Sequence, residues 1–215
     1  MANLKEFKKV LILQGGISDE HDVSMKTGNE VFKALEKKYN VRKFTVTFNI
    51  NKLLSEIEDF KPDIIFNALH GLFGEDGQIQ SILNLVKVPY THSGVSSSSI
   101  GMNKLLSKYI FQNIGINCPQ GEKIKVSDIN KTNMTLPLII KPINGGSSIG
   151  IQKLSDMKPK TLKKIEDAIG KNTEVLIEKF ISGRELTVGI LNNKICGITE
   201  IIPKIDFYDY ENKYI

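Results

Sequence analysis

The residues of 136–150 have the types and spacing that can bind phosphate. An apolar run, LPLIIKP, carries Lys141 near its end and leads directly into the loop INGGSSIG. A lysine at a strand end supplies a fixed positive charge, while glycines let backbone N–H groups approach phosphate oxygens and serine hydroxyls add donors. The loop has neither the spacing of a P-loop nor a clear helix after it, as a dinucleotide fingerprint requires. Taken alone, it is also compatible with a glycine-rich hairpin beside an exposed lysine.

Acidic and basic residues elsewhere could serve the same ligand. Glu178 and Glu185 flank a strand–turn–strand unit within VLIEKFISGRELTVGIL (175–191). Their carboxylates could accept hydrogen bonds from a ribose diol or an adenine amino group. Lys104, near the start of a helix, could reach the same phosphates. A charged strand edge and an exposed helix lysine explain these residues equally well in isolation.

A histidine follows a buried strand in FNALHGLFGEDGQIQ (66–80). Glycines punctuate the loop after His70, around Glu75 and Asp76, before a helix begins. At the carboxyl end of a parallel strand such a histidine points toward the ligand crevice of an α/β sheet. The alternative is a histidine that caps a turn, but the strand–loop–helix context favours a functional role. His21 and His92 lack this placement, and we interpret them as structural.

A carboxylate lies where the first strand passes into the first helix. Glu20, in LILQGGISDEHDVSMKTG (11–28), falls in the loop or the first helical turn. The helix dipole keeps a carboxylate ionised there, and a persistent anion in a crevice suits an ammonium group. An ordinary acid at a helix start is the alternative.

Strands and helices alternate over residues 1–96 and must position these groups. Apolar runs predict strands at 10–13, 44–48, 63–69 and 88–92, with helices at 22–38, 52–60 and 78–86. The first helix should turn Val23, Val31, Ala34 and Leu35 inward. This alternation predicts a parallel sheet with helices on both faces, and the glycine-rich loops follow its strands.

The pattern becomes α+β after the serine run 96–99. A helix at 101–113 precedes strands at 122–126, 136–142, 151–154 and 175–180, with a helix at 160–169 between the last two. An antiparallel hairpin, turning at Asn192-Asn193, ends the pattern.

Composition excludes several classes of protein. The 215 residues are 40% hydrophobic, enough to bury a core in one or two domains, and no apolar run approaches the ~20 residues of a membrane span. The N-terminal apolar run is too short for a signal peptide, so we expect a cytoplasmic protein.

Cys118 and Cys196 lack metal-ligand spacing and are expected to be buried thiols. The net charge of +5 is scattered, with no basic stripe interleaved with aromatic residues, and a small anion such as ATP explains it as well as nucleic acid does.

Together, the order and spacing of these motifs resemble the D-alanine–D-alanine ligases, a family of the ATP-grasp superfamily. The resemblance runs from residue 8 to the last residue, through GGISDEHDVS, FNALHGLFGEDGQIQ, GMNK (101–104), LIIKPINGGSSIG, LIEKFISGRELTVGIL and FYDYENKY. The histidine–glycine loop and FYDYENKY are its most specific parts. The resemblance implies an α/β protein: a parallel α/β substrate domain (1–96), a central ATP-grasp lobe (97–181) and the start of a C-terminal ATP-grasp lobe (182–215).

The resemblance also implies a reaction and its participants. ATP phosphorylates the carboxylate of one D-alanine, and the amine of a second D-alanine displaces phosphate, giving a dipeptide for peptidoglycan. ATP and Mg²⁺ (or Mn²⁺) are the implied cofactors and two D-alanines the implied partners, without nucleic acid or membrane. A homodimer through the N-terminal domain is the suggested assembly.

Site residues can be transferred by motif as expectations. Glu20 would hold the first ammonium, His70 would lie on that substrate's carboxylate side, and Glu20, Ser147 and Tyr214 would form a catalytic hydrogen-bonded set. The residues implied to bind ATP are Lys104, Lys141, Glu178, Phe180, Ile181, Glu185 and Lys213.

One departure from the family concerns the metal. Members continue beyond the matched part with an arginine for the oxyanion and with carboxylate and asparagine ligands for two magnesium ions. No such residues can be located here, since Glu200 and Asp206 do not match the pattern. The metal ligands are therefore expected beyond Ile215, and the 215 residues alone are expected to be inactive.

Three alternative functions remain: another ATP-grasp ligase, a binding module for a nucleotide or a D-amino acid, and a basic nucleic-acid binder. The last fits only the isoelectric point.

Overall fold

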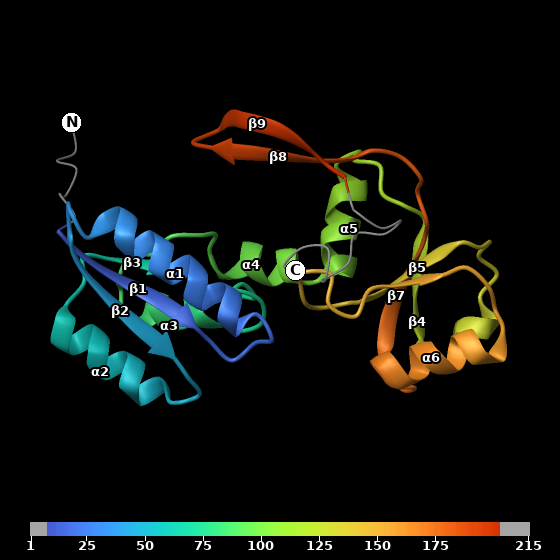
Figure 1. Cartoon of the computed structure of the whole chain (residues 1–215), viewed down its shortest axis with the longest axis horizontal. Helices are drawn as coiled ribbons and strands as arrows, with labels where there is room; N and C mark the ends of the chain where they lie inside the picture. The colour runs from blue at the N-terminus through green and yellow to red at the C-terminus, as the bar shows by residue number, and fades with distance from the viewer. Residues whose placement is uncertain (1–7, 203–215) are drawn as a thin grey trace. The chain divides into compact units, whose positions relative to one another are not determined.

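The computed structural model describes residues 8–202 and divides the chain into two compact units, Met1–Ser107 and Lys108–Ile215 (Figure 1). Each unit is considered by itself. Within the described residues, no helix is long and apolar enough to cross a membrane. The predicted three-part division at residues 96 and 181 is finer than this and stays a prediction.

The first unit contains a parallel three-stranded sheet with the order β2-β1-β3. Its elements are β1 (Lys9–Gly15), α1 (His21–Leu35), β2 (Asn40–Val46), α2 (Ile50–Phe60), β3 (Ile64–Asn67), α3 (Gln78–Leu85) and α4 (Val95–Met102). The predicted parallel α/β architecture is therefore confirmed.

The side chains of the central strand β1 alternate between the two faces of the sheet, and both faces are buried. Leu11 and Leu13 pack in one cluster with side chains of α2 and α3. Val10 and Ile12 pack in another, against α1 residues. Figure 1 shows α1 on one side of the sheet and α2 on the other. This double cover explains why the strand is continuously apolar.

The inner face of α1 differs from the prediction in which residues are buried. Ala34 is exposed, whereas Ser24 and Gly28 are buried. Ser24 Oγ donates to the carbonyl oxygen of Ala68 at 2.7 Å, which satisfies the buried hydroxyl. Gly28 lies against Gln14, where an added Cβ would be 2.4 Å from Gln14 Oε1. The helix thus approaches the sheet so closely that only small residues fit.

Two further predictions are corrected here. The predicted strand 88–92 makes a single bridge, between Ile65 and Tyr90, rather than a full strand. The predicted helix 101–113 is broken at Asn103, whose backbone is extended, into α4 and α5 (Lys104–Asn113). The Asn103 side chain accepts hydrogen bonds from the N–H groups of Leu105 and Leu106, so it caps the start of α5.

The second unit contains an antiparallel four-stranded sheet with the order β4-β7-β5-β6. The strands are β4 (Gly121–Lys125), β5 (Leu138–Pro142), β6 (Gln152–Leu154) and β7 (Glu174–Lys179); α6 is Pro159–Ile169 and a 3-10 helix, η1, is Val126–Lys131. Buried side chains of α6 and η1, Ile165 and Ile129, pack against one face of this sheet. The 3-10 helix was not predicted, but the α+β character of this half is confirmed.

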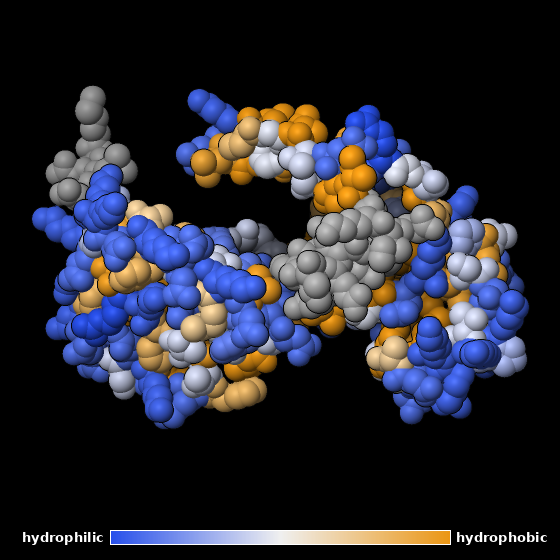
Figure 2. All heavy atoms as spheres, in the orientation of Figure 1, coloured by the Kyte–Doolittle hydropathy of each residue, from blue (hydrophilic) through white to orange (hydrophobic). Residues whose placement is uncertain are grey.

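The predicted hairpin is present as β8 (Glu185–Leu191) and β9 (Lys194–Ile201). Asn192 and Asn193 both have positive φ, 50° and 60°, as a two-residue hairpin turn requires. Apolar side chains such as Val188 and Ile198 are exposed on the hairpin, and Figure 2 shows hydrophobic atoms gathered there. Cys196 on β9 is also exposed, so the expectation that it is buried is wrong.

The close approach of α1 to β1 can be tested at Gly28. Gly28→Ala should lower the free energy of unfolding by up to about 2 kcal/mol, because overpacking against Gln14 costs roughly 1–3 kcal/mol and helix propensity returns only about 1 kcal/mol. The control is Gly101→Ala in α4, where nothing lies within 4 Å of the new methyl group. That change should stabilise by about 0.5–1 kcal/mol. Urea unfolding followed by circular dichroism compares them, and equal stabilisation of both variants would contradict the close packing.

Candidate substrate and nucleotide sites

The loops after β1 and β3 meet at one edge of the first sheet. Because the strands are parallel, their carboxyl ends open onto the same side. Ser18 Oγ donates to the carbonyl oxygen of His70 at 2.7 Å and accepts from the Glu20 N–H at 3.2 Å. One serine therefore joins the two loops that carry the predicted substrate residues, Glu20 and His70.

The Glu20 carboxylate is buried against the histidine–glycine loop. Glu20 is 5% exposed and precedes α1 as its N-cap residue. A Cβ on Gly71 would lie 2.7 Å from Glu20 Oε2, and Gly71 has a φ of 67°. Both the contact and the conformation require glycine here. The result is a buried carboxyl group at a helix N-terminus, where the helix dipole favours negative charge.

The histidine–glycine loop is held by its own acidic residues. Glu75 accepts the N–H of Gly71 at 2.7 Å, and Asp76 accepts that of Phe73 at 2.9 Å. Asn67, at the end of β3, donates to the carbonyl oxygen of Gly74. These contacts fix the backbone on which His70 is carried.

The His70 ring itself contacts α1. Its Nε2 lies 3.0 Å from Thr27 Oγ1. Thr27 was not singled out from the sequence, because a threonine inside a helical pattern carries no signal of its own. By contrast, His21 Nδ1 lies 2.9 Å from the carbonyl oxygen of Gly16, a contact that suits its predicted structural role.

In the second unit, Lys141 and Glu178 share the sheet face opposite α6. Side chains alternate along β5 and β7, and Ile140 and Ile177 face the core on the α6 side. Lys141 Nζ donates to Glu178 Oε2 at 2.6 Å. Two predicted nucleotide residues are thus paired with each other.

A buried lysine completes this group. Lys108 Nζ donates to Glu178 Oε1 at 2.5 Å and also to the carbonyl oxygen of Pro119. The side chains of Lys108 and Glu178 are only 9% and 7% exposed. Gly121 makes room for the pair, since a Cβ there would lie 2.7 Å from Glu178 Cγ. Lys108 is a site residue that was not predicted from the sequence. Nothing in the sequence distinguishes it from the rest of the 29 lysines and arginines.

The two lysines determine the charge of Glu178. Burial alone would raise the pKa of its carboxyl, but the hydrogen bonds from Lys108 and Lys141 outweigh burial and hold that pKa below its usual range. Each carboxylate oxygen can still accept one more hydrogen bond, and Lys141 retains two further donors. The group can therefore contact a polar ligand while its own charges stay paired.

The glycine–serine loop after β5 adopts an uncommon backbone. Gly145, Ser147, Ser148 and Gly150 all have positive φ, between 50° and 106°. Two consecutive serines in this region are costly and occur mainly at functional sites. Turns of this kind direct neighbouring N–H groups to one side, where they can bind an anion.

The structure gives fewer contacts for the other residues predicted to bind the nucleotide. Phe180 follows β7, and its ring lies under Lys153 Nζ, 4.2 Å from the ring centre. Ile181 is 60% exposed, and Glu185 is exposed at the start of β8. Lys104 begins α5 and belongs to the first unit. Lys213 and Tyr214 lie outside the described residues.

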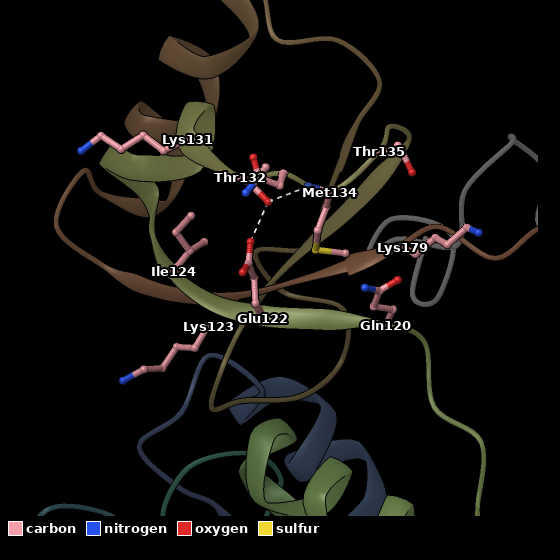
Figure 3. A pocket seen from close by; sticks show the side chains of 10 residues that line it. Gln120, Glu122, Lys123, Ile124, Lys131, Thr132, Met134, Thr135 and Lys179 are labelled. Carbon is pink, nitrogen blue, oxygen red and sulfur yellow. Dashed lines mark hydrogen bonds between the residues drawn. The ribbon is translucent and has the colours of Figure 1, made fainter.

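A separate pocket of about 520 Å³ lies along β4 in the second unit (Figure 3). Its lining includes Glu122, Lys123 and Lys179, together with the segment around Thr132. Thr132 Oγ1 donates to Glu122 at 2.6 Å across the pocket. No predicted site residue lines it, so it is distinct from the two sites above.

Two protein-family models match the chain. The model described as D-ala D-ala ligase N-terminus matches residues 46–93, and the one described as D-ala D-ala ligase C-terminus matches residues 110–215. Among curated relatives, a D-alanine–D-alanine ligase of Pelagibacter ubique is 46% identical over 96% of this chain and 69% of its own length. That of Paramagnetospirillum magneticum is 41% identical over 96% and 68%. The chain therefore spans about two thirds of these relatives.

Solved structures give the same result. D-alanine–D-alanine ligase from Bacillus anthracis superposes with a TM-score of 0.78 at 32% identity, over 95% of this chain and 68% of that one. Its complex with ATP gives a TM-score of 0.76 at 30% identity, over 94% and 68%. The VanG D-Ala:D-Ser ligase of Enterococcus faecalis gives 0.73 at 28% identity, over 98% and 74%.

The role of Lys108 can be tested by stability. Lys108→Met should lower the free energy of unfolding by about 1.5–3 kcal/mol, because a buried carboxylate loses one of two charged partners. The matched control is Lys123→Met on β4, which removes an exposed pair with Glu174 at 3.0 Å. That loss should stay below about 1 kcal/mol. Urea unfolding measures both, and equal losses would show that Lys108 is not part of a buried charge group.

Proposed function

The chain belongs to the D-alanine–D-alanine ligase family, and from this premise we propose that its two units divide the ATP-dependent ligation of two D-alanines, for peptidoglycan precursor synthesis, between them. The first unit binds the D-alanine that becomes activated. The second unit binds ATP.

The observation that carries this proposal is the burial of Glu20 against the histidine–glycine loop. A carboxyl group held at a helix N-terminus can accept hydrogen bonds from a cationic group, and the ammonium group of an amino acid supplies three donors. His70, on the adjoining loop, is suited to the carboxylate side of the same substrate. The first unit thus offers complementary groups to both ends of an amino acid.

The second unit supports a nucleotide site. Lys141 brings positive charge to the end of β5, and the left-handed backbone around Ser147 offers N–H donors to phosphate. Lys104 and Lys213 are proposed to add charge. Glu178, Glu185, Phe180 and Ile181 are proposed to contact the adenosine part, with Glu178 acting through the acceptor sites that its lysines leave.

The proposed reaction has two steps. A D-alanine carboxylate oxygen takes the γ-phosphoryl group of ATP, which leaves ADP and a D-alanyl phosphate. The amine of the second D-alanine then attacks the carbonyl carbon, phosphate leaves, and the amine loses a proton. The chain's part is to hold the reacting groups in place and away from water, since positioning provides much of the rate of phosphoryl transfer. A catalytic set of Glu20, Ser147 and Tyr214 remains a prediction.

Magnesium or manganese is part of the proposal only at the level of the family. Among residues 8–202, no group of three or more His, Cys, Asp or Glu side chains could hold a metal ion. The described residues therefore do not fit the metal, and no step is derived through it. The inactivity of these 215 residues alone, the homodimer and the cytoplasmic location likewise remain predictions.

The amino-acid site is tested by calorimetric titration of the chain with D-alanine. Glu20→Gln should weaken binding at least tenfold, because a charge-assisted contact worth about 1.5–3 kcal/mol is lost. Glu36→Gln, at the exposed end of the same helix, is the control and should bind like the parent chain. Undiminished binding by the Glu20 variant would remove the basis of the proposal.

The nucleotide site is tested by the same titration with ATP. Lys141→Ala should weaken ATP binding about tenfold, the effect of losing one charge-assisted contact of roughly 1.5 kcal/mol. Lys123→Ala changes an exposed lysine on the same sheet and should have little effect. D-alanine binding should be unchanged in both variants. If the two lysines proved interchangeable for ATP, Lys141 would belong to the general surface charge.

A further inference from the structure

One hydroxyl group on α1 lies between the His70 ring and a backbone carbonyl. Thr27 Oγ1 is 3.0 Å from His70 Nε2 and 3.0 Å from the carbonyl oxygen of Val23, one helical turn earlier. Thr27 and His70 are both partly buried. Neither contact was expected from the sequence.

The single proton of this hydroxyl can serve only one of the two contacts. The Val23 oxygen can only accept, so a proton must lie between it and Thr27 Oγ1; otherwise two oxygen atoms would face each other at 3.0 Å through lone pairs. Thr27 therefore donates to Val23. Its oxygen must then accept from His70, which requires a hydrogen on Nε2.

The second ring nitrogen of His70 remains available. Among the described residues, no hydrogen bond reaches Nδ1 of this ring. If Nε2 keeps its hydrogen in both charge states, Nδ1 is the atom that changes, from a lone pair in the neutral ring to an N–H in the cation.

We propose that Thr27 is a positioning residue: it holds His70 as the Nε2–H tautomer and leaves Nδ1 as the ring atom that meets the bound D-alanine. The second half of this statement rests on the proposed function; the first half does not. A ring fixed in this way presents Nδ1 as an acceptor when the ring is neutral and as an N–H donor, the form that suits the substrate carboxylate, when the ring is the cation. A neutral ring free to exchange tautomers would present the same atom as either.

His21 provides an internal reference for the tautomer of His70. His21 Nδ1 lies 2.9 Å from the carbonyl oxygen of Gly16, so His21 must carry its hydrogen on Nδ1 when neutral. The chain has three histidines. Nitrogen-15 NMR of the ring nitrogens, recorded at a pH where the rings are neutral, should therefore show two opposite tautomers in one spectrum.

The test compares two substitutions in the 215-residue chain. Thr27→Val keeps the shape and removes the hydroxyl, whereas Thr27→Ser keeps the hydroxyl. The ratio of the Nε2–H to the Nδ1–H tautomer of His70 should fall about two- to tenfold in Thr27→Val, as expected for the loss of one ordinary hydrogen bond, and stay high in Thr27→Ser. The His21 signals should not change in either variant, which also reports that the fold is intact.

Clear outcomes overturn each half of the proposal. An Nδ1–H tautomer for His70 in the parent chain, or an unchanged ratio in Thr27→Val, rules out the role of Thr27. D-alanine should then be added, with L-alanine as the control, and should shift the Nδ1 signal of His70 more than the Nε2 signal. If D-alanine binds without moving Nδ1, the assigned contact is wrong although the tautomer result stands. If D-alanine does not bind at all, the proposed function fails.

Discussion

The first unit depends on keeping its two glycine-rich loops together at the end of a parallel sheet. Ser18 and Ser24 do this by donating to the carbonyl oxygens of His70 and Ala68, each at 2.7 Å. These bonds satisfy backbone acceptors that leave the strand ladder where β3 stops, and buried acceptors must be satisfied somewhere. As a consequence, Glu20 and His70, fifty residues apart in the chain, lie on adjoining backbone.

The second unit depends on the burial of charged side chains. Taking a carboxylate out of water is costly unless cations and hydrogen bonds compensate it. Glu178 meets that condition through Lys108 and Lys141, and Gly121 provides the space. The resulting group is fixed in position beside a loop whose serines adopt left-handed backbone. Both units thus use small residues to bring charged side chains close to backbone.

Sequence patterns predicted the elements better than the contacts. The apolar periods located β1 and α2, because burial of one face or both leaves a direct trace in residue order. The exposed β8–β9 hairpin was located by its Asn192-Asn193 turn between two apolar runs. The break at Asn103 was missed because the helical pattern continues across it, and only the capping geometry shows the interruption. The inner face of α1 was partly misassigned because Ser24 and Gly28, which are buried there, carry no apolar signal, whereas the apolar Ala34 is exposed. Thr27 and Lys108 could not be found, since their roles depend on partners 43 and 70 residues away in the chain.

The central claim is that the first unit binds the amino acid and the second binds ATP. Chemical-shift mapping of backbone amides in the 215-residue chain tests it directly, with each ligand added separately. D-alanine should shift the amides of Ser18, Glu20 and Gly71, and ATP those of Lys141, Gly145 and Ser148. A D-alanine response confined to the second unit, or no response near Glu20 at saturating D-alanine, would contradict the account.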